Sequence, residues 1–144
     1  HYLIGEQVIS APIVKDIGLE VIATGYILLD GGNVTSVEFM SGTRPIPMDK
    51  KDIVASHALA GQYLGMKSIY LEAGSGAKNY IPSDIIELVS NFVSIPIIVG
   101  GGISSPKIAA KLVKAGASII VTGTAIEKNH SCMSEFASAV HWKG

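Results

Sequence analysis

Two polar side chains, Tyr70 and Glu72, stand at the end of an otherwise apolar segment, and their spacing could bring them together. Side chains alternate along a strand, so Tyr70 and Glu72 would share one face while Ile69, Leu71 and Ala73 share the other. A buried carboxylate without a partner is costly. We therefore interpret Glu72 as a catalytic or ligand-binding residue; a structural ion pair or a solvated strand end is the alternative.

Glycine-bearing segments follow three successive apolar runs: Gly74-Ser75-Gly76, Gly100-Gly101-Gly102 and Gly123-Thr124. Glycines let a backbone approach an anion closely, and the N–H groups of a following helix point toward it. Any one of these segments taken alone is more simply explained as a tight turn. Three adjacent strand ends with the same feature favour phosphate binding.

Alternating strands and helices must position these residues. Buried strands are predicted at residues 21–29, 67–73, 95–99 and 117–122, with a short strand at 34–39. Helices are predicted at residues 6–18 and 49–64, after Ser83, after Ser105 and at 131–142, with Asp49, Ser83 and Ser105 as N-caps. Such alternation indicates an α/β protein with a parallel sheet, whose ligands bind at the carboxyl ends of the strands. Tyr26, inside the first predicted strand, could line that pocket or belong to the core.

Length leaves two architectures open. A chain of 144 residues and 15.0 kDa suits one domain, and a doubly wound sheet could be complete with four or five strands. A (βα)8 barrel uses about 250 residues, so these strands would then be half a barrel. The start at His1, without methionine, leads us to expect that the beginning of the chain is absent.

Composition excludes several classes of protein. With 48% hydrophobic residues the chain is not disordered, and a net charge of −1 gives no sign of a basic surface that would bind nucleic acid. No apolar run reaches the ~18 residues of a membrane span. A single cysteine, Cys132, cannot form an intrachain disulfide, and no basic leader precedes an apolar segment, so we expect a cytoplasmic protein.

Three motifs, at residues 70–77 (YLEAGSGA), 98–103 (IVGGGI) and 120–124 (IVTGT), occur in an order that closely resembles the archaeal geranylgeranylglyceryl phosphate synthases. Residues 23–27 also look like the fifth strand of that family, and the resemblance runs from about residue 20 to residue 128. It implies a parallel (βα)8 TIM barrel of which residues 1–144 form the C-terminal half, about the last four βα units.

The resemblance also implies a reaction. The family joins the C3 hydroxyl of sn-glycerol 1-phosphate to a geranylgeranyl group from geranylgeranyl diphosphate, which makes the first ether bond of archaeal membrane lipids. Carried onto this sequence, the glycerol phosphate would be held by Tyr70, Leu71, Glu72, Ala73, Gly74, Ser75 and Gly76, and its phosphate cradled by Gly101, Gly102, Gly123 and Thr124. Glu72 would take the C3 proton.

The same resemblance implies a magnesium ion that neutralises the departing diphosphate, with ligands in the first strands of the barrel. We therefore expect no metal ligand in this chain, and an isolated chain that is inactive and exposes two sheet edges. The family forms dimers and larger assemblies, so a homo-oligomer is expected.

Two other functions remain open at this point. One is a different phosphate-binding barrel, an isomerase or synthase of histidine or tryptophan biosynthesis, which would not need Tyr70 and Glu72 together before Gly-Ser-Gly. The other is a noncatalytic, flavodoxin-like phosphate-binding module. Such modules often carry acidic residues at the end of the first strand, where this chain offers only Asp30.

Overall fold

The sheet is built from four parallel strands. In a computed structural model that describes residues 5–141, these are β1 (Thr24–Leu28), β2 (Ser68–Glu72), β3 (Ile97–Gly100) and β4 (Ile119–Val121), in the order β1-β2-β3-β4. Each lies within or overlaps a strand predicted from an apolar run, and the predicted runs are longer than the paired strands.

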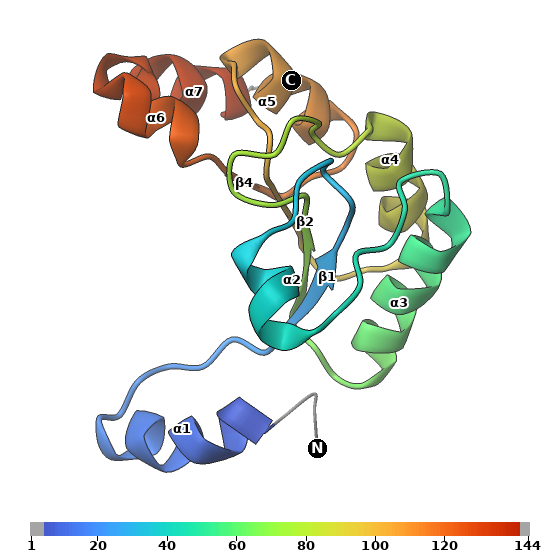
Figure 1. Ribbon diagram of the computed structural model, residues 1–144, viewed down its shortest axis with the longest axis vertical. Helices are drawn as coiled ribbons and strands as arrows, with labels where there is room; N and C mark the ends of the chain where they lie inside the picture. The colour runs from blue at the N-terminus through green and yellow to red at the C-terminus, as the bar shows by residue number, and fades with distance from the viewer. Residues whose placement is uncertain (1–4, 142–144) are drawn as a thin grey trace.

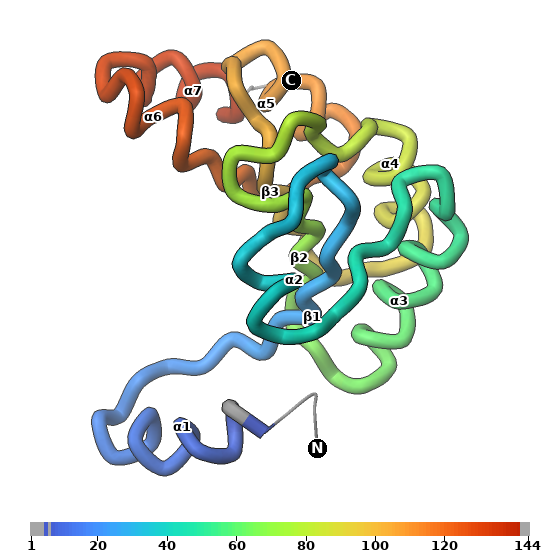
Figure 2. Tube along the Cα trace, in the orientation of Figure 1, coloured from blue at the N-terminus to red at the C-terminus, as the bar shows by residue number. Residues whose placement is uncertain are grey.

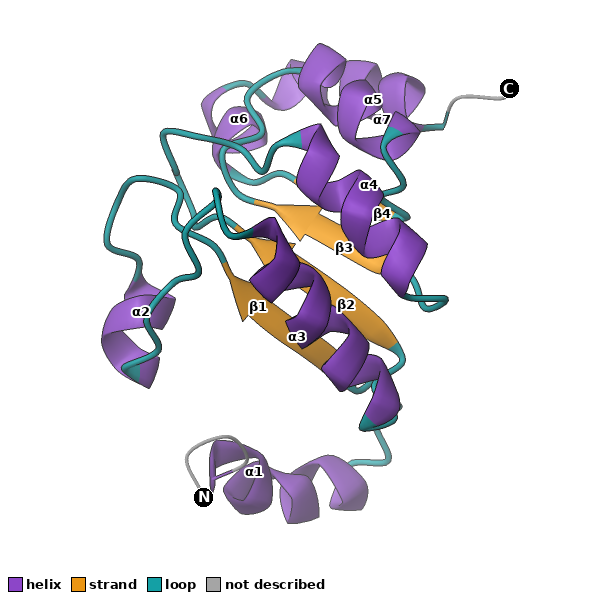
Figure 3. Ribbon diagram, turned by 90° about the vertical axis from the view of Figure 1, so that its right-hand side faces the viewer, coloured by secondary structure: helices purple, strands orange, loops and turns teal. Residues whose placement is uncertain are grey.

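Helices follow the strands and also precede the first one. They are α1 (Gly5–Asp16), α2 (Ser36–Ser41), α3 (Lys51–Tyr63), α4 (Ser83–Phe92), α5 (Pro106–Lys114), α6 (Thr124–Lys128) and α7 (Met133–Val140), with a 3₁₀ turn, η1 (His130–Cys132), before α7. Helices α3, α4 and α5 lie together on one side of the sheet (Figures 1 and 3). Helix α1 stands apart at the end of an extended segment (Figure 2).

The strand order decides between the two architectures. Each crossover from β1 to β4 leads to the adjacent parallel strand, and right-handed crossovers in one direction put every connecting helix on the same face. A doubly wound sheet would reverse its order at a switch point and carry helices on both faces. The four strands are therefore the wall of a barrel, and a complete doubly wound sheet is excluded.

The two faces of this wall differ in burial. On the face under the helices, Ile69, Leu71 and Val99 are fully buried against α3 to α5. On the opposite, inner face, Ile119 and Val121 are 51% and 41% exposed. The core thus lies between the sheet and the helices, and the described residues leave much of the inner face uncovered.

The strand predicted at residues 34–39 is wrong, because this segment forms helix α2. The Thr35 side chain accepts a hydrogen bond from the Glu38 N–H at 3.0 Å, and Gly42 ends the helix in the left-handed conformation with φ +63°. These two caps satisfy backbone groups at the two ends of the helix. The composition does not reveal them, because β-branched residues by themselves favour a strand.

Two of the three predicted N-caps are also wrong. Helix α3 is preceded by Lys50 rather than capped by Asp49, and Ser83 is the first residue of α4, after Pro82, with its hydroxyl unpartnered. Pro82 fixes the backbone direction at the start of α4 through its restricted φ. No side chain accepts a hydrogen bond at this cap. The prediction for Ser105 is confirmed, since its hydroxyl accepts from the N–H of Ile108.

The C-terminal helix predicted at residues 131–142 is partly wrong. It starts at Met133, after the turn η1, and its predicted end at residue 142 lies outside the described residues. The short helix α6, directly after β4, was not predicted. None of the helices within residues 5–141 is long and apolar enough to cross a membrane.

Gly65 and Gly116 offer a matched test of the packing behind the sheet. Both follow a helix with positive φ, +89° and +113°, so alanine is strained at each by about 1–2 kcal/mol. A Cβ at Gly65 meets nothing within 4 Å, whereas one at Gly116 would lie 2.7 Å from the Ser90 Cβ. In urea unfolding, we expect Gly116→Ala to lower the free energy of unfolding more than Gly65→Ala. Equal losses would contradict the α4–α5 packing.

Candidate active site at the carboxyl ends of the strands

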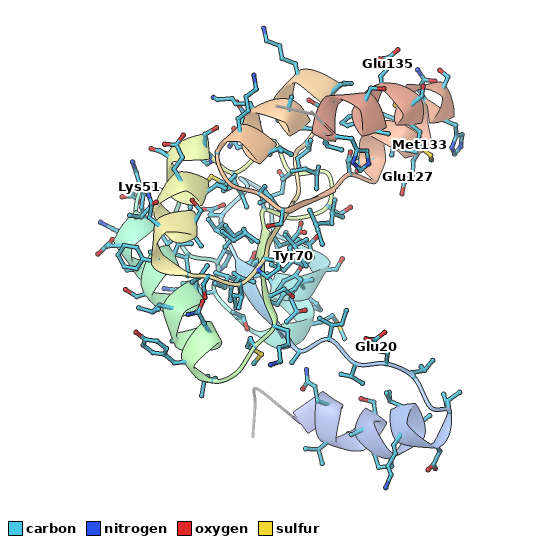
Figure 4. All side chains as sticks on the ribbon, turned by 180° about the vertical axis from the view of Figure 1, so that it is seen from behind. Glu20, Lys51, Tyr70, Glu127, Met133 and Glu135 are labelled. Carbon is cyan, nitrogen blue, oxygen red and sulfur yellow. The ribbon has the colours of Figure 1, made fainter. Side chains whose placement is uncertain are left out.

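Strand β2 places Tyr70 and Glu72 on the inner face, as the alternation predicts. Register pairs Tyr70 with Tyr26 of β1, and Glu72 with Gly100 of β3. Glu72 is 7% exposed although it carries a carboxylate. Tyr70 lies in the middle of the molecule, between the α6–α7 side and the α1 side (Figure 4).

Neutral groups hold the Glu72 carboxylate. Its Oε1 atom accepts a hydrogen bond from the Gly74 N–H at 2.6 Å, so the turn after β2 folds back onto the end of its own strand. The Tyr70 hydroxyl donates a second hydrogen bond to the same side chain. Neither partner carries a formal positive charge, so these contacts are not the structural ion pair that was the alternative.

Tyr26 packs edge-on against Tyr70, with ring centroids 5.0 Å apart and planes at 71°. Burial, and then the charge of Glu72, raise the pKa of Tyr26 to about 12. The pKa of Tyr70 is raised further, first by burial and then by its hydrogen bond to Glu72. Both phenols therefore keep their protons at neutral pH, and Tyr70 stays a donor to Glu72. Tyr26, left open by the sequence, thus lies beside the site.

A pocket of about 570 Å³ opens beside this pair, at the carboxyl ends of β2, β3 and β4. Of the residues predicted to bind substrate, those that line it are Tyr70, Glu72, Ser75, Gly76, Gly101, Gly102, Gly123 and Thr124. Leu71 and Ala73 are fully buried and face the helices instead, while the N–H of Gly74 bonds Glu72. The structure therefore brings together most of the predicted site and separates these side chains from it.

Glycine is required at Gly101 by both conformation and space. Its φ is +88°, and a Cβ there would lie 2.7 Å from the Gly74 backbone nitrogen. Side chains rarely adopt this conformation, and backbone cannot move aside as a side chain can. The loops after β2 and β3 consequently pack backbone to backbone, which leaves N–H-bearing segments at the pocket wall.

Part of the pocket was missed in the sequence. Helix α6 and the residues after it contribute Lys128, Asn129, Cys132 and Phe136 to the wall. A short extra helix after the final strands is typical of phosphate sites in barrels. The signal was present in Gly123-Thr124 followed by Ala-Ile-Glu-Lys, but so short a helix has no periodic apolar face that a pattern could reveal.

Strands in sequential order, helices on one face and a glycine-lined pocket at the strand ends define the chain as a wall of a (βα)-barrel protein. The chain belongs to the PcrB family, whose model matches residues 1–140. It spans about half the length of the curated relatives it matches.

Two of these relatives carry the same name, geranylgeranylglyceryl phosphate synthase. The protein of Chitinophaga pinensis is 55% identical over 139 residues, which are 96% of this chain and 55% of the relative. That of Pyrococcus horikoshii is 48% identical over 130 residues, or 90% of this chain and 50% of the relative.

Solved structures share the fold. The (S)-3-O-geranylgeranylglyceryl phosphate synthase of Thermoplasma acidophilum, crystallised in complex with its substrate sn-glycerol-1-phosphate, superposes with a TM-score of 0.83 at 34% identity, covering 95% of this chain and 53% of that one. The wild-type enzyme from Thermoplasma volcanium gives a TM-score of 0.86, also at 34% identity, with 95% and 55% covered. The fold is therefore that of the TIM-barrel members of this family, as expected from the motifs, and the flavodoxin-like alternative is wrong.

The raised pKa of Tyr26 predicts a pH dependence of stability. Because this pKa lies near 12 in the folded chain and at 10.0 ordinarily, the folded state holds the proton longer than the unfolded state. The contribution is complete below pH 10 and is lost as the pH rises toward 12. In urea unfolding at stepped pH, Tyr26→Phe should reduce this fall, while Tyr63→Phe, at a tyrosine 78% exposed, should not. An unchanged slope in Tyr26→Phe would contradict the raised pKa of Tyr26.

Proposed function

We propose that this chain is the C-terminal part of a prenyltransferase that joins the C3 hydroxyl of sn-glycerol 1-phosphate to a geranylgeranyl group from geranylgeranyl diphosphate. The observation that carries the proposal is the buried Glu72 carboxylate, held by Tyr70 and facing a glycine-lined pocket. Membership of the PcrB family and the names of the relatives favour this reaction over another phosphate-binding isomerase or synthase.

The pocket wall carries two kinds of chemistry. Gly101, Gly102, Gly123 and Thr124 line it, and Lys128 adds a positive charge. Backbone N–H groups and a cation suit a phosphate. Glu72 also lines the pocket, and its carboxylate suits the glycerol hydroxyls. This combination supports a substrate that carries both a phosphate and hydroxyl groups, as glycerol phosphate does.

Glu72 is proposed as the base. As the C3 oxygen attacks the first carbon of the prenyl group, the new C–O bond forms, the bond to the diphosphate breaks, and the diphosphate leaves with the electron pair. The proton of the C3 hydroxyl passes to the Glu72 carboxylate, which must lie within hydrogen-bonding distance of that hydroxyl. Tyr70 and the Gly74 N–H keep the carboxylate oriented toward the pocket.

The described residues do not fit a magnesium site. Within residues 5–141, no three His, Cys, Asp or Glu side chains gather closely enough to hold a metal ion. No residue of this chain is therefore assigned as a ligand, and no step is routed through the ion. Magnesium dependence of the whole enzyme stays a proposal, together with a cytoplasmic location and a homo-oligomeric state.

Replacement of the base gives a direct test. In a protein that joins this chain to the part of the Chitinophaga pinensis relative it leaves uncovered, Glu72→Gln should lower kcat by about 10²- to 10⁴-fold, because proton transfer is lost. Binding of inorganic phosphate, measured by calorimetry, should persist because the glycine loops are unchanged. Glu135→Gln, on the exposed side of α7, is the matched control (Figure 4). Full activity of Glu72→Gln would rule out its role as base.

Activity of the isolated chain tests the proposal that residues outside it complete the site. We expect no prenyl transfer from the 144 residues alone, and transfer by the joined protein that stops when EDTA removes the metal. A radiolabelled prenyl donor with extraction of the lipid product measures both. Turnover by the isolated chain without added metal would contradict the proposed mechanism.

A further inference from the structure

We infer that Gly100 is a positioning residue. Because it has no side chain, Tyr70 and Glu72 can occupy the space above it and stay hydrogen-bonded to each other. This inference rests on the proposed function, since it assigns a role toward the proposed base. It goes beyond the phosphate-binding role of the glycine loops, because Gly100 lies in β3 rather than in the loop that follows it.

The space over Gly100 is already occupied. A Cβ there would lie 2.7 Å from Glu72 Oε2 and 3.0 Å from a ring carbon of Tyr70, and would overlap the Tyr70 hydroxyl most of all. Glu72 and Gly100 are register neighbours, so the carboxylate leans directly across the neighbouring strand. The hydrogen-bonded pair therefore rests on the bare backbone of β3.

Backbone conformation does not explain a glycine at this place. The next two residues, Gly101 and Gly102, have φ of +88° and +69°, whereas Gly100 is not among the glycines with positive φ. Gly100 is the last residue of β3, where glycine still loses more entropy on folding than other residues and packs no side chain. The reason for glycine here is thus the occupied space above it.

Two contacts restrain the pair on the other side. Tyr26 of β1 packs edge-on against the Tyr70 ring, and Glu72 Oε1 is bound to the Gly74 N–H. A methyl group on β3 would therefore push the Tyr70 hydroxyl and Glu72 Oε2 toward the pocket and part them. Gly100 and Tyr26 lie on either side of β2 and together fix the position of the Glu72 carboxylate.

Kinetics of Gly100→Ala in the joined protein test the role. A misplacement of about 1 Å costs on the order of 100-fold in rate, so we expect kcat to fall by that order while KM for glycerol phosphate changes by only about threefold. Gly61→Ala is the matched control, because its methyl also presses on β2, but from the helix side, against the flexible end of Ile69. It should leave kcat unchanged.

A second readout does not require turnover. With tyrosine ¹³C-labelled at Cζ, NMR reports the surroundings of each phenol hydroxyl in the chain itself at neutral pH. Gly100→Ala should shift the Tyr70 Cζ resonance, because its hydroxyl is parted from Glu72, while Gly61→Ala should leave that resonance unchanged. If the joined wild-type protein transfers no prenyl group but this shift occurs, the proposed function fails and the positioning by Gly100 stands.

The double variant covers a failure of Gly100→Ala to fold. Tyr70→Phe removes the atom that the new methyl overlaps most, so Gly100→Ala should destabilise the chain less in the Tyr70→Phe background than alone. Equal destabilisation in both backgrounds would overturn the inference. Unchanged kcat together with an unchanged Tyr70 Cζ resonance would overturn it as well.

Discussion

The rest of the site is built around a carboxylate that is buried at the end of a strand and must be hydrogen-bonded there. Glu72 is nearly inaccessible, so its oxygens need donors from the protein. The loop after β2 folds back to supply the Gly74 N–H, and the strand itself supplies the Tyr70 hydroxyl two residues earlier. The adjacent strand must then be free of a side chain, as it is at Gly100. One polar group thus explains residues on three different segments.

Strand order gives this carboxylate its surroundings. Because β1 to β4 follow one another in parallel with helices on one face, all carboxyl ends meet at one rim and the loops after β2, β3 and β4 form a single pocket. The opposite, inner face stays partly open among the described residues, with Ile119 and Val121 exposed. Helix α1 likewise leaves Ile9 and Ile13 exposed. An apolar face of this kind is what the closure of a barrel would cover.

The phenols contribute electrostatics as well as shape. Tyr26 and Tyr70 are neutral neighbours of a carboxylate, and their raised pKa values keep them so across the physiological range. A neutral donor orients Glu72 without placing a positive charge beside the carboxylate. Lys128, a positive residue in the pocket wall, comes instead from α6.

The amino-acid sequence predicts the four strands, the shared face of Tyr70 and Glu72, and the Ser105 cap, because each depends on alternation or on contacts within a few residues. The motifs were long enough to indicate the family as well. Local patterns failed where a cap competed with composition, as in α2 at Thr35, and where a helix was too short for a period, as in α6. The positions of Tyr26 beside the site and of Gly100 under Glu72 become apparent only in the folded chain. Both depend on the register between strands more than 25 residues apart in the chain, which no local spacing encodes.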